Sequence, residues 1–154
     1  ILSFLFSSFS IITFVFLVAS DKSINNSKCP VNIFAAKLNA LQMPGVIFRP
    51  IAFIPNYGMY ADELCQGVQM HITDKRSFQP AHVGAQMVRL LMKDYSQRDL
   101  FPRRSSDGYK IDIALGESSL RYAEIPLGDI FNRWDRENAY FAEKAQPYLL
   151  YPLK

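Results

Sequence analysis

Cysteine, histidine and tryptophan are scarce in this chain of 154 residues, which contains 2 Cys, 2 His and 1 Trp. The two cysteines, Cys29 and Cys65, match no spacing typical of a metal site, so no metal is expected. They could form a disulfide only in an exported chain that brings their Cα atoms close together; two unpaired thiols with Cys65 buried are an equally open interpretation. The sequence also lacks a glycine-rich phosphate loop and the HExxH and GxSxG motifs, so no cofactor is expected.

A strong charge of one sign is also missing. The formal net charge is +3, and lysine and arginine are scattered among aspartate and glutamate without a basic stripe. Nucleic acid is therefore excluded as a partner. At this length we expect one folded domain.

The first charge comes only at Asp21, after the apolar and hydroxyl-bearing run ILSFLFSSFSIITFVFLVA. At a rise of about 1.5 Å per residue, residues 1–19 could just span a bilayer as a helix. Val18-Ala19-Ser20 also offers the small residues that a signal peptidase accepts. The chain begins without Met and without a positive residue ahead of the run, which predicts an incomplete or mis-joined start of the reading frame.

Three interpretations of this run stay open, namely an export signal, a membrane anchor or a non-native leader. All three exclude residues 1–20 from the fold. Residues 21–30 form a polar linker, and the folded domain is expected over residues 31–154. An export signal or an anchor would place the chain in the periplasm, outside the cell or at the membrane.

Two strands are expected in the middle of the chain. Residues 45–53 are rich in β-branched and aromatic side chains, and Pro50 among them indicates an edge strand or a bulge. Residues 67–73 alternate strictly, with Val68, Met70 and Ile72 on one face and Gln69, His71 and Thr73 on the other. The connection between the strands carries Tyr57 and Tyr60 and is longer than a hairpin needs, which is typical of functional loops.

Helical periodicity predicts helices over residues 31–41, from about Pro80 through an apolar stripe ending at Leu91, and over residues 127–144, with shorter helical pieces at 111–115 and 118–123. The tail Tyr148–Tyr151 is expected to dock on the domain. The predicted fold class is α+β, a small sheet covered by about three helices and preceded by an apolar N-terminal segment.

The chemistry suggested by the residues alone is limited. Arg49 shares a strand face with Ile47 and Ile51, so it either reaches water, pairs with an acid or binds an anion. His71 is either an ordinary hydrogen-bonded histidine or part of a site beside the long loop. Glycosidase chemistry needs two carboxyl groups across one bond, and nothing in the spacing of the nearby acids singles out such a pair.

Several ordered motifs carry a family resemblance. The run LNALQMPGVIFRPIAFIPNYGMYADELCQGVQMHITDKRSFQPAHVG, then IDIALGESSLR and the ending PYLLYP, resemble the C-terminal domain of the exo-β-N-acetylmuramidase family. These bacterial glycoside hydrolases release N-acetylmuramic acid from the non-reducing ends of peptidoglycan fragments. The resemblance runs from about Phe34 to Pro152. It implies a second, Rossmann-like N-terminal domain that carries the catalytic glutamate, and that domain is missing here.

By this resemblance the chain holds the wall of a substrate cleft and no catalytic residue. Its expected ligand is a muropeptide or an N-acetylmuramic acid glycoside, and its expected partner is a separate Rossmann-like catalytic domain. Arg49 would face the lactyl carboxylate of muramic acid, and two loop tyrosines would pack on a sugar face. The expected substrate-binding residues are Arg49, Tyr57, Tyr60, Gln69, His71 and Asp74.

Whether the chain is an enzyme is left open, because a fragment of such a hydrolase would be inactive alone. The alternative is a non-catalytic muropeptide-binding module, exported or tethered to the membrane. A structural domain without a ligand is the third possibility.

Overall fold

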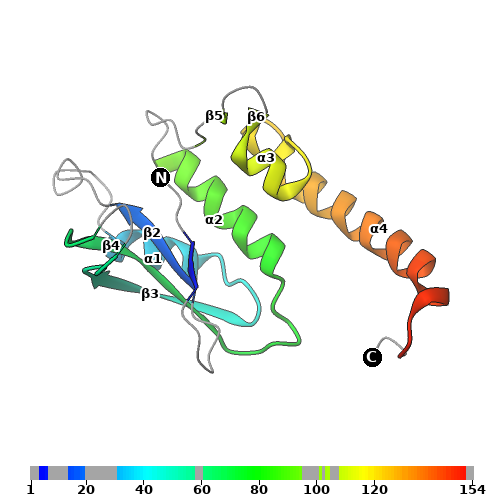
Figure 1. The fold of residues 1–154 in the computed structure, drawn as a ribbon, viewed down its shortest axis with the longest axis horizontal. Helices are drawn as coiled ribbons and strands as arrows, with labels where there is room; N and C mark the ends of the chain where they lie inside the picture. The colour runs from blue at the N-terminus through cyan, green and yellow to red at the C-terminus, as the bar shows by residue number, and fades with distance from the viewer. Residues whose placement is uncertain are drawn as a thin grey trace. The chain divides into compact units, whose positions relative to one another are not determined.

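The computed structural model describes residues 4–6, 14–19, 31–57, 61–94, 101, 103–104 and 108–151. It divides into two compact units, Ile1–Pro102 and Arg103–Lys154. The architecture is α+β, as the sequence predicted (Figure 1).

The first unit contains an antiparallel sheet and two helices. Four strands follow the order β1-β2-β4-β3 and span Phe4–Phe6 (β1), Phe14–Ala19 (β2), Val46–Phe53 (β3) and Cys65–Ile72 (β4). The helices are α1, Val31–Ala40, and α2, Pro80–Asp94. Both helices begin and end close to the predicted bounds, whereas β4 begins two residues before the predicted Gly67, because its pairing with β3 continues to Phe53 opposite Cys65.

The core of this unit lies between one face of β3 and β4 and the two helices. Phe34 and Leu38 of α1 are fully buried, and they meet Phe48 and Val68 of the sheet. Burying each such side chain contributes about 1.5–3 kcal/mol. Helix α2 adds the periodic stripe Val83, Met87 and Leu91. Because side chains alternate along a strand, the residues between these core positions lie on the opposite face of the sheet.

Strand β3 forms an edge of the sheet, as Pro50 predicted. The side chain of Asn39 in α1 bonds both backbone groups of Phe48: its Nδ2 donates to the carbonyl at 2.7 Å, and its Oδ1 accepts from the N–H at 2.8 Å. These groups therefore point away from β4. Two residues on, Pro50 has the same orientation and has no N–H to leave unpaired there.

Strand β2 differs from the expectation that residues 1–20 stand outside the fold. Phe14–Ala19 pairs antiparallel with β4, with Val15 opposite Gln69 and Leu17 opposite Gly67. The physical reason is that a run of aromatic and β-branched residues suits a β-strand as well as it suits the apolar core of a signal or an anchor. The export and anchor interpretations of the run stay predictions.

Gly45, just before β3, packs against the turn of residues 74–78 that follows β4. The carbonyl oxygen of Gly45 accepts hydrogen bonds from the N–H groups of Thr73 at 2.9 Å and Asp74 at 3.4 Å. Gly45 has φ +70°, and a Cβ there would lie 2.4 Å from the carbonyl oxygen of Asp74. Only glycine fits this close approach.

The second unit is mostly helical. Its elements are β5 (Arg103–Arg104), β6 (Gly108–Tyr109), α3 (Lys110–Leu115), the 3-10 turns η2 (Ser119–Arg121) and η3 (Gln146–Tyr148), and α4 (Leu127–Ala145). As predicted, α3 ends at Gly116, which is left-handed with φ 73°. In the tail of this unit Leu150 and Tyr151 are 92% and 81% exposed. No helix in the described parts of either unit is long and apolar enough to cross a membrane.

Candidate functional site

Three of the residues predicted for the site, Arg49, Gln69 and His71, gather on one side of β3 and β4. We call this side the Arg49 face and define it by Ile47, Arg49, Gln69 and His71. In the antiparallel register Arg49 lies opposite Gln69, and Ile47 lies opposite His71. Arg49 and His71 are therefore diagonal neighbours, about 7–8 Å apart in a regular antiparallel pair. The arginine and the imidazole therefore share one side of the sheet.

Arg49 and Gln69 are joined directly. The Nε–H of Arg49 donates a hydrogen bond to Oε1 of Gln69 across the two strands. Arg49 lies on the edge strand and is exposed, whereas Gln69 lies on β4, between β2 and β3. The arginine is thus anchored from a strand that is itself paired on both sides. No acid among the described residues pairs with its terminal guanidinium nitrogens.

His71 is partly buried beside this pair. Its Nε2 atom is closed off from solvent and has no hydrogen-bond partner among the described residues. A buried polar atom without a partner costs about 1–3 kcal/mol, and most buried polar atoms in proteins are hydrogen-bonded, so this atom is an exception. Ile47, its cross-strand neighbour, is 54% exposed and offers apolar surface next to the two polar side chains.

The other predicted residues do not join this group. Tyr57 follows the end of β3 and is 70% exposed, while Asp74 follows the opposite end of the strand pair, after Ile72. The eight paired residues of β3 separate the two ends by about 23 Å at 3.3 Å per residue. Tyr60 lies outside the described residues. The structure therefore brings together three of the six residues.

The carboxylate of Asp74 is hydrogen-bonded within the turn that Asp74 begins. Its Oδ1 accepts a hydrogen bond from the backbone N–H of Arg76 at 3.0 Å, and its Oδ2 accepts one from the hydroxyl of Ser77 at 2.7 Å. These bonds, the one from Arg76 foremost, hold the pKa of the Asp74 carboxyl below its usual range. Both oxygens stabilise the turn that follows β4, which gives Asp74 a structural role.

Cys65 begins β4 as a buried free thiol, and Cys29 lies outside the described residues. Burial, followed by the negative charge of Glu63, raises the pKa of the Cys65 thiol. A thiol of this kind stays protonated at neutral pH and is a poor nucleophile.

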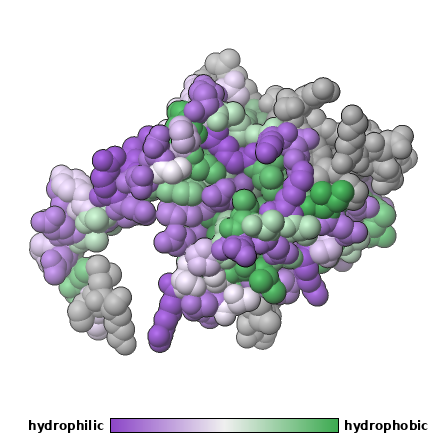
Figure 2. Space-filling model, turned by 180° about the vertical axis from the view of Figure 1, so that it is seen from behind, coloured by the Kyte–Doolittle hydropathy of each residue, from purple (hydrophilic) through white to green (hydrophobic). Residues whose placement is uncertain are grey.

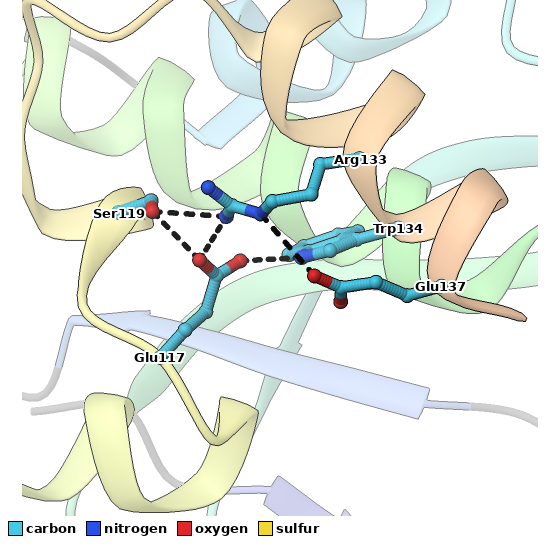
Figure 3. Close-up of polar contacts among 5 residues, drawn as sticks. All are labelled: Glu117, Ser119, Arg133, Trp134 and Glu137. Carbon is cyan, nitrogen blue, oxygen red and sulfur yellow. Dashed lines mark hydrogen bonds and ion pairs between the residues drawn. The ribbon is translucent and has the colours of Figure 1, made fainter.

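The second unit contains a polar cluster that the sequence analysis missed. Glu117 accepts hydrogen bonds from Ser119 Oγ at 2.6 Å, from Nη2 of Arg133 and from Nε1 of Trp134 (Figure 3). Burial raises the pKa of Glu117, but the bonds from Ser119, Trp134 and Arg133 outweigh it and lower the pKa below its ordinary value. Arg133 also reaches Glu137 at 3.9 Å.

A second ion pair lies nearby in the same unit. Arg121 bonds both oxygens of Asp112, with its Nε at 2.8 and 2.9 Å, and its guanidinium lies over the ring of Tyr109 at 3.9 Å. The bond to Asp112 raises the pKa of Arg121 above its ordinary value.

Both clusters bind the η2 turn to the neighbouring helices. The carboxylates of Glu117 and Asp112 are both held in hydrogen bonds, so neither is free for proton transfer. The signal available in the sequence was an acid in the short Gly-Glu-Ser-Ser stretch, whose partners lie 16 and 17 residues further on.

Apolar side chains lie in separate groups among polar ones on the face shown in Figure 2. Among the described residues, no group of three or more His, Cys, Asp or Glu side chains is placed to hold a metal ion.

Comparison with known proteins agrees with this fold. The protein-family model described as "Exo-beta-N-acetylmuramidase NamZ, C-terminal" matches residues 13–151. Peptidoglycan beta-N-acetylmuramidase NamZ of Bacillus subtilis (strain 168) is 28% identical over 118 residues, which cover 74% of this chain and 27% of that protein.

The crystal structure of a DUF1343 family protein from Bacteroides fragilis NCTC 9343 superposes with a TM-score of 0.68 and 24% identity, over 90% of this chain and 35% of that one. The chain thus spans about a third or less of the length of the proteins it matches. The family match begins at residue 13, so it includes β2. The chain belongs to the family of exo-β-N-acetylmuramidase NamZ C-terminal domains.

Proposed function

We propose that this chain is the substrate-binding part of a peptidoglycan-degrading exo-β-N-acetylmuramidase and that its Arg49 face holds the muramyl end of the substrate. The observation that carries the proposal is the grouping of Arg49, Gln69 and His71 on one side of β3 and β4, within the region matched by the family. An exposed guanidinium suits the lactyl carboxylate that distinguishes muramic acid from glucosamine.

The proposal assigns no catalytic group to this chain. In the second unit Glu117 and Asp112 are bound in ion pairs, and in the first unit Asp74 is bound in its turn. Hydrolysis would need two carboxyl groups placed across the glycosidic bond. We therefore infer that a separate domain, Rossmann-like by the family resemblance, supplies the acid and base.

The test of this proposal has two parts. Calorimetric titration of the full chain with N-acetylmuramic acid should give measurable heat, and Arg49→Ala should weaken the affinity by about tenfold or more. A chromogenic N-acetylmuramide should not be cleaved by the chain alone, whereas the Bacillus subtilis relative serves as the positive control. Flat titrations of the wild-type chain would reject muramyl binding and leave a structural domain as the answer.

The alternative, a stand-alone muropeptide-binding module, shares the binding step and differs only in whether hydrolysis comes after it. Adding the remaining part of the relative in trans separates the two. Hydrolysis restored by that addition supports a divided hydrolase, whereas binding without any restored hydrolysis supports the module.

We also propose that the chain acts outside the cytoplasm, in the periplasm, the extracellular space or at the membrane surface, because peptidoglycan lies there. A signal peptidase cut after Ala19 would remove β2 from the sheet, so retention of that strand and use of residues 1–19 as a cleaved signal exclude each other. Mass spectrometry of the N-terminus from fractionated cells decides between them. A mature chain starting at Ser20 would contradict the place of β2 in the native sheet.

A further inference from the structure

The bond between Arg49 and Gln69 has a specific chemical consequence. A guanidinium carries five N–H donors in one plane, and the Gln69 carbonyl uses the one on Nε. The other four belong to the two terminal nitrogens, which make no hydrogen bond with the described residues. A carboxylate is best bound by parallel N–H groups in the plane of the guanidinium, so the orientation of that plane decides whether the fork is usable.

We infer that Gln69 is a positioning residue that fixes the plane of the Arg49 guanidinium and presents its terminal fork to the carboxylate of the ligand. This inference rests on the proposed function, from which it takes the lactyl carboxylate of a muramyl residue as the ligand group. Gln69 does not touch the ligand itself. It acts through Arg49, from the strand that lies between β2 and β3.

The neutral amide is important to this role. A glutamate at position 69 would also accept the Nε–H, but its charge would neutralise the arginine and repel an incoming carboxylate. A leucine would remove the acceptor and let the long arginine side chain sample many rotamers, which costs binding entropy. Gln69 supplies the hydrogen bond without the competing charge, and the cross-strand register with Arg49 sets the two side chains at the right separation.

Three sugars distinguish binding of the charged lactyl carboxylate from binding of the rest of the sugar. N-acetylmuramic acid carries the lactyl carboxylate, its methyl ester carries the same group without charge, and N-acetylglucosamine lacks the group. Calorimetry on the full chain should show a preference of about tenfold or more for the acid over the ester. Gln69→Leu should cut this preference by about fivefold or more while leaving N-acetylglucosamine binding unchanged, because only the fork is disturbed.

Two further variants keep the test decisive if Gln69→Leu folds poorly. Gln69→Asn retains an amide that is one methylene too short to reach Nε, and Gln69→Glu retains the reach but adds charge. Both should lose the preference for the acid. The matched control is Gln66→Leu, on the same strand opposite Ala52, which should keep it. A folded Gln69→Leu or Gln69→Asn chain with the wild-type preference overturns the inference and leaves the bond as a cross-strand stabiliser.

Failure of the proposed function is recognised separately. If the wild-type chain binds none of the three sugars, muramyl binding is rejected, and sodium lactate then serves as the probe of the fork. Lactate should shift the Nε–H signal of Arg49 in the wild-type NMR spectrum and shift it much less in Gln69→Leu. An Arg49 signal that lactate does not move in the wild-type chain overturns the positioning role as well.

Discussion

Asn39 and Phe48 are joined by two hydrogen bonds, so a single side chain of α1 satisfies both outward backbone groups of an edge-strand residue. An amide side chain has the same donor and acceptor as a peptide group and takes the place that a further strand would occupy. Edge strands are prone to pairing with other molecules, and this contact closes the edge next to Arg49.

Replacing this amide tests its role. Asn39→Leu should lower the free energy of unfolding by about 1–3 kcal/mol, because the N–H and the carbonyl of Phe48 lose their partners. It should also increase self-association through the β3 edge. Urea unfolding measures the first effect, and light scattering coupled to size exclusion measures the second. The control is Asn32→Ala, an exposed position of the same helix, which should leave both nearly unchanged.

Gly45 and Gly84 should respond in opposite directions to the same substitution. Gly45→Ala should destabilise the chain by about 1–3 kcal/mol, because the residue has a left-handed backbone conformation and its new methyl group would collide with the turn. Gly84→Ala in α2 should stabilise it by about 0.5–1 kcal/mol, because nothing lies within 4 Å of the added atom. Equal effects of both changes on the melting temperature would show that the turn is not built as described.

The contribution of Asp74 in this turn to the stability of the chain should depend on pH. The hydrogen bonds from Arg76 and Ser77 lower the pKa of Asp74 in the folded chain. The carboxylate therefore contributes stability above its unfolded pKa of about 3.9, and this contribution is lost as the pH falls through the lower folded pKa.

Comparison with Asp74→Asn isolates the contribution of the Asp74 carboxylate to stability. The difference in melting temperature between the wild type and the variant should be constant above about pH 5 and should shrink as the pH falls below 4. Because the carboxylate holds a turn, sugar affinity at neutral pH should change far less than in Arg49→Ala. A difference that grows in acid would mean that the pKa of Asp74 is raised.

The only tryptophan of the sequence reports on the second unit, because Trp134 donates to Glu117. Glu117→Gln keeps the shape of the side chain but loses its charge and part of its capacity to accept three donors. We expect it to lower the stability seen by tryptophan fluorescence by about 1–3 kcal/mol. The control is Glu143→Gln, at an exposed position of helix α4, which also carries Trp134; it should not move the transition. Equal shifts for the two variants would show that the Glu117 cluster does not stabilise this unit.

Local patterns were enough to predict which side chains share a face. The alternation of residues 67–73 placed Gln69 and His71 away from the core, and Pro50 identified an edge strand, because both effects depend only on neighbours along the chain. The direct bond between Arg49 and Gln69 depends on the register of the two strands. Register is a property of the assembled pair and could not be read from either strand alone.

The same limit explains the parts that were missed. The run that contains Phe14–Ala19 is apolar enough for an export signal, an anchor or a β-strand, and its pairing with β4 could not be read from the run alone. Glu117 was overlooked because its partners come from a helix that begins ten residues later. Tyr57 and Asp74 were placed in the site by the family resemblance, but they lie beyond opposite ends of the strand pair.

The most direct test of muramyl binding by the Arg49 face is an NMR titration of the isotope-labelled full chain with N-acetylmuramic acid. Binding at this face predicts progressive shifts at Arg49, Gln69 and His71, with little change around Glu117. Shifts that are absent, or that are confined to the residues around Glu117 and Trp134, would contradict it.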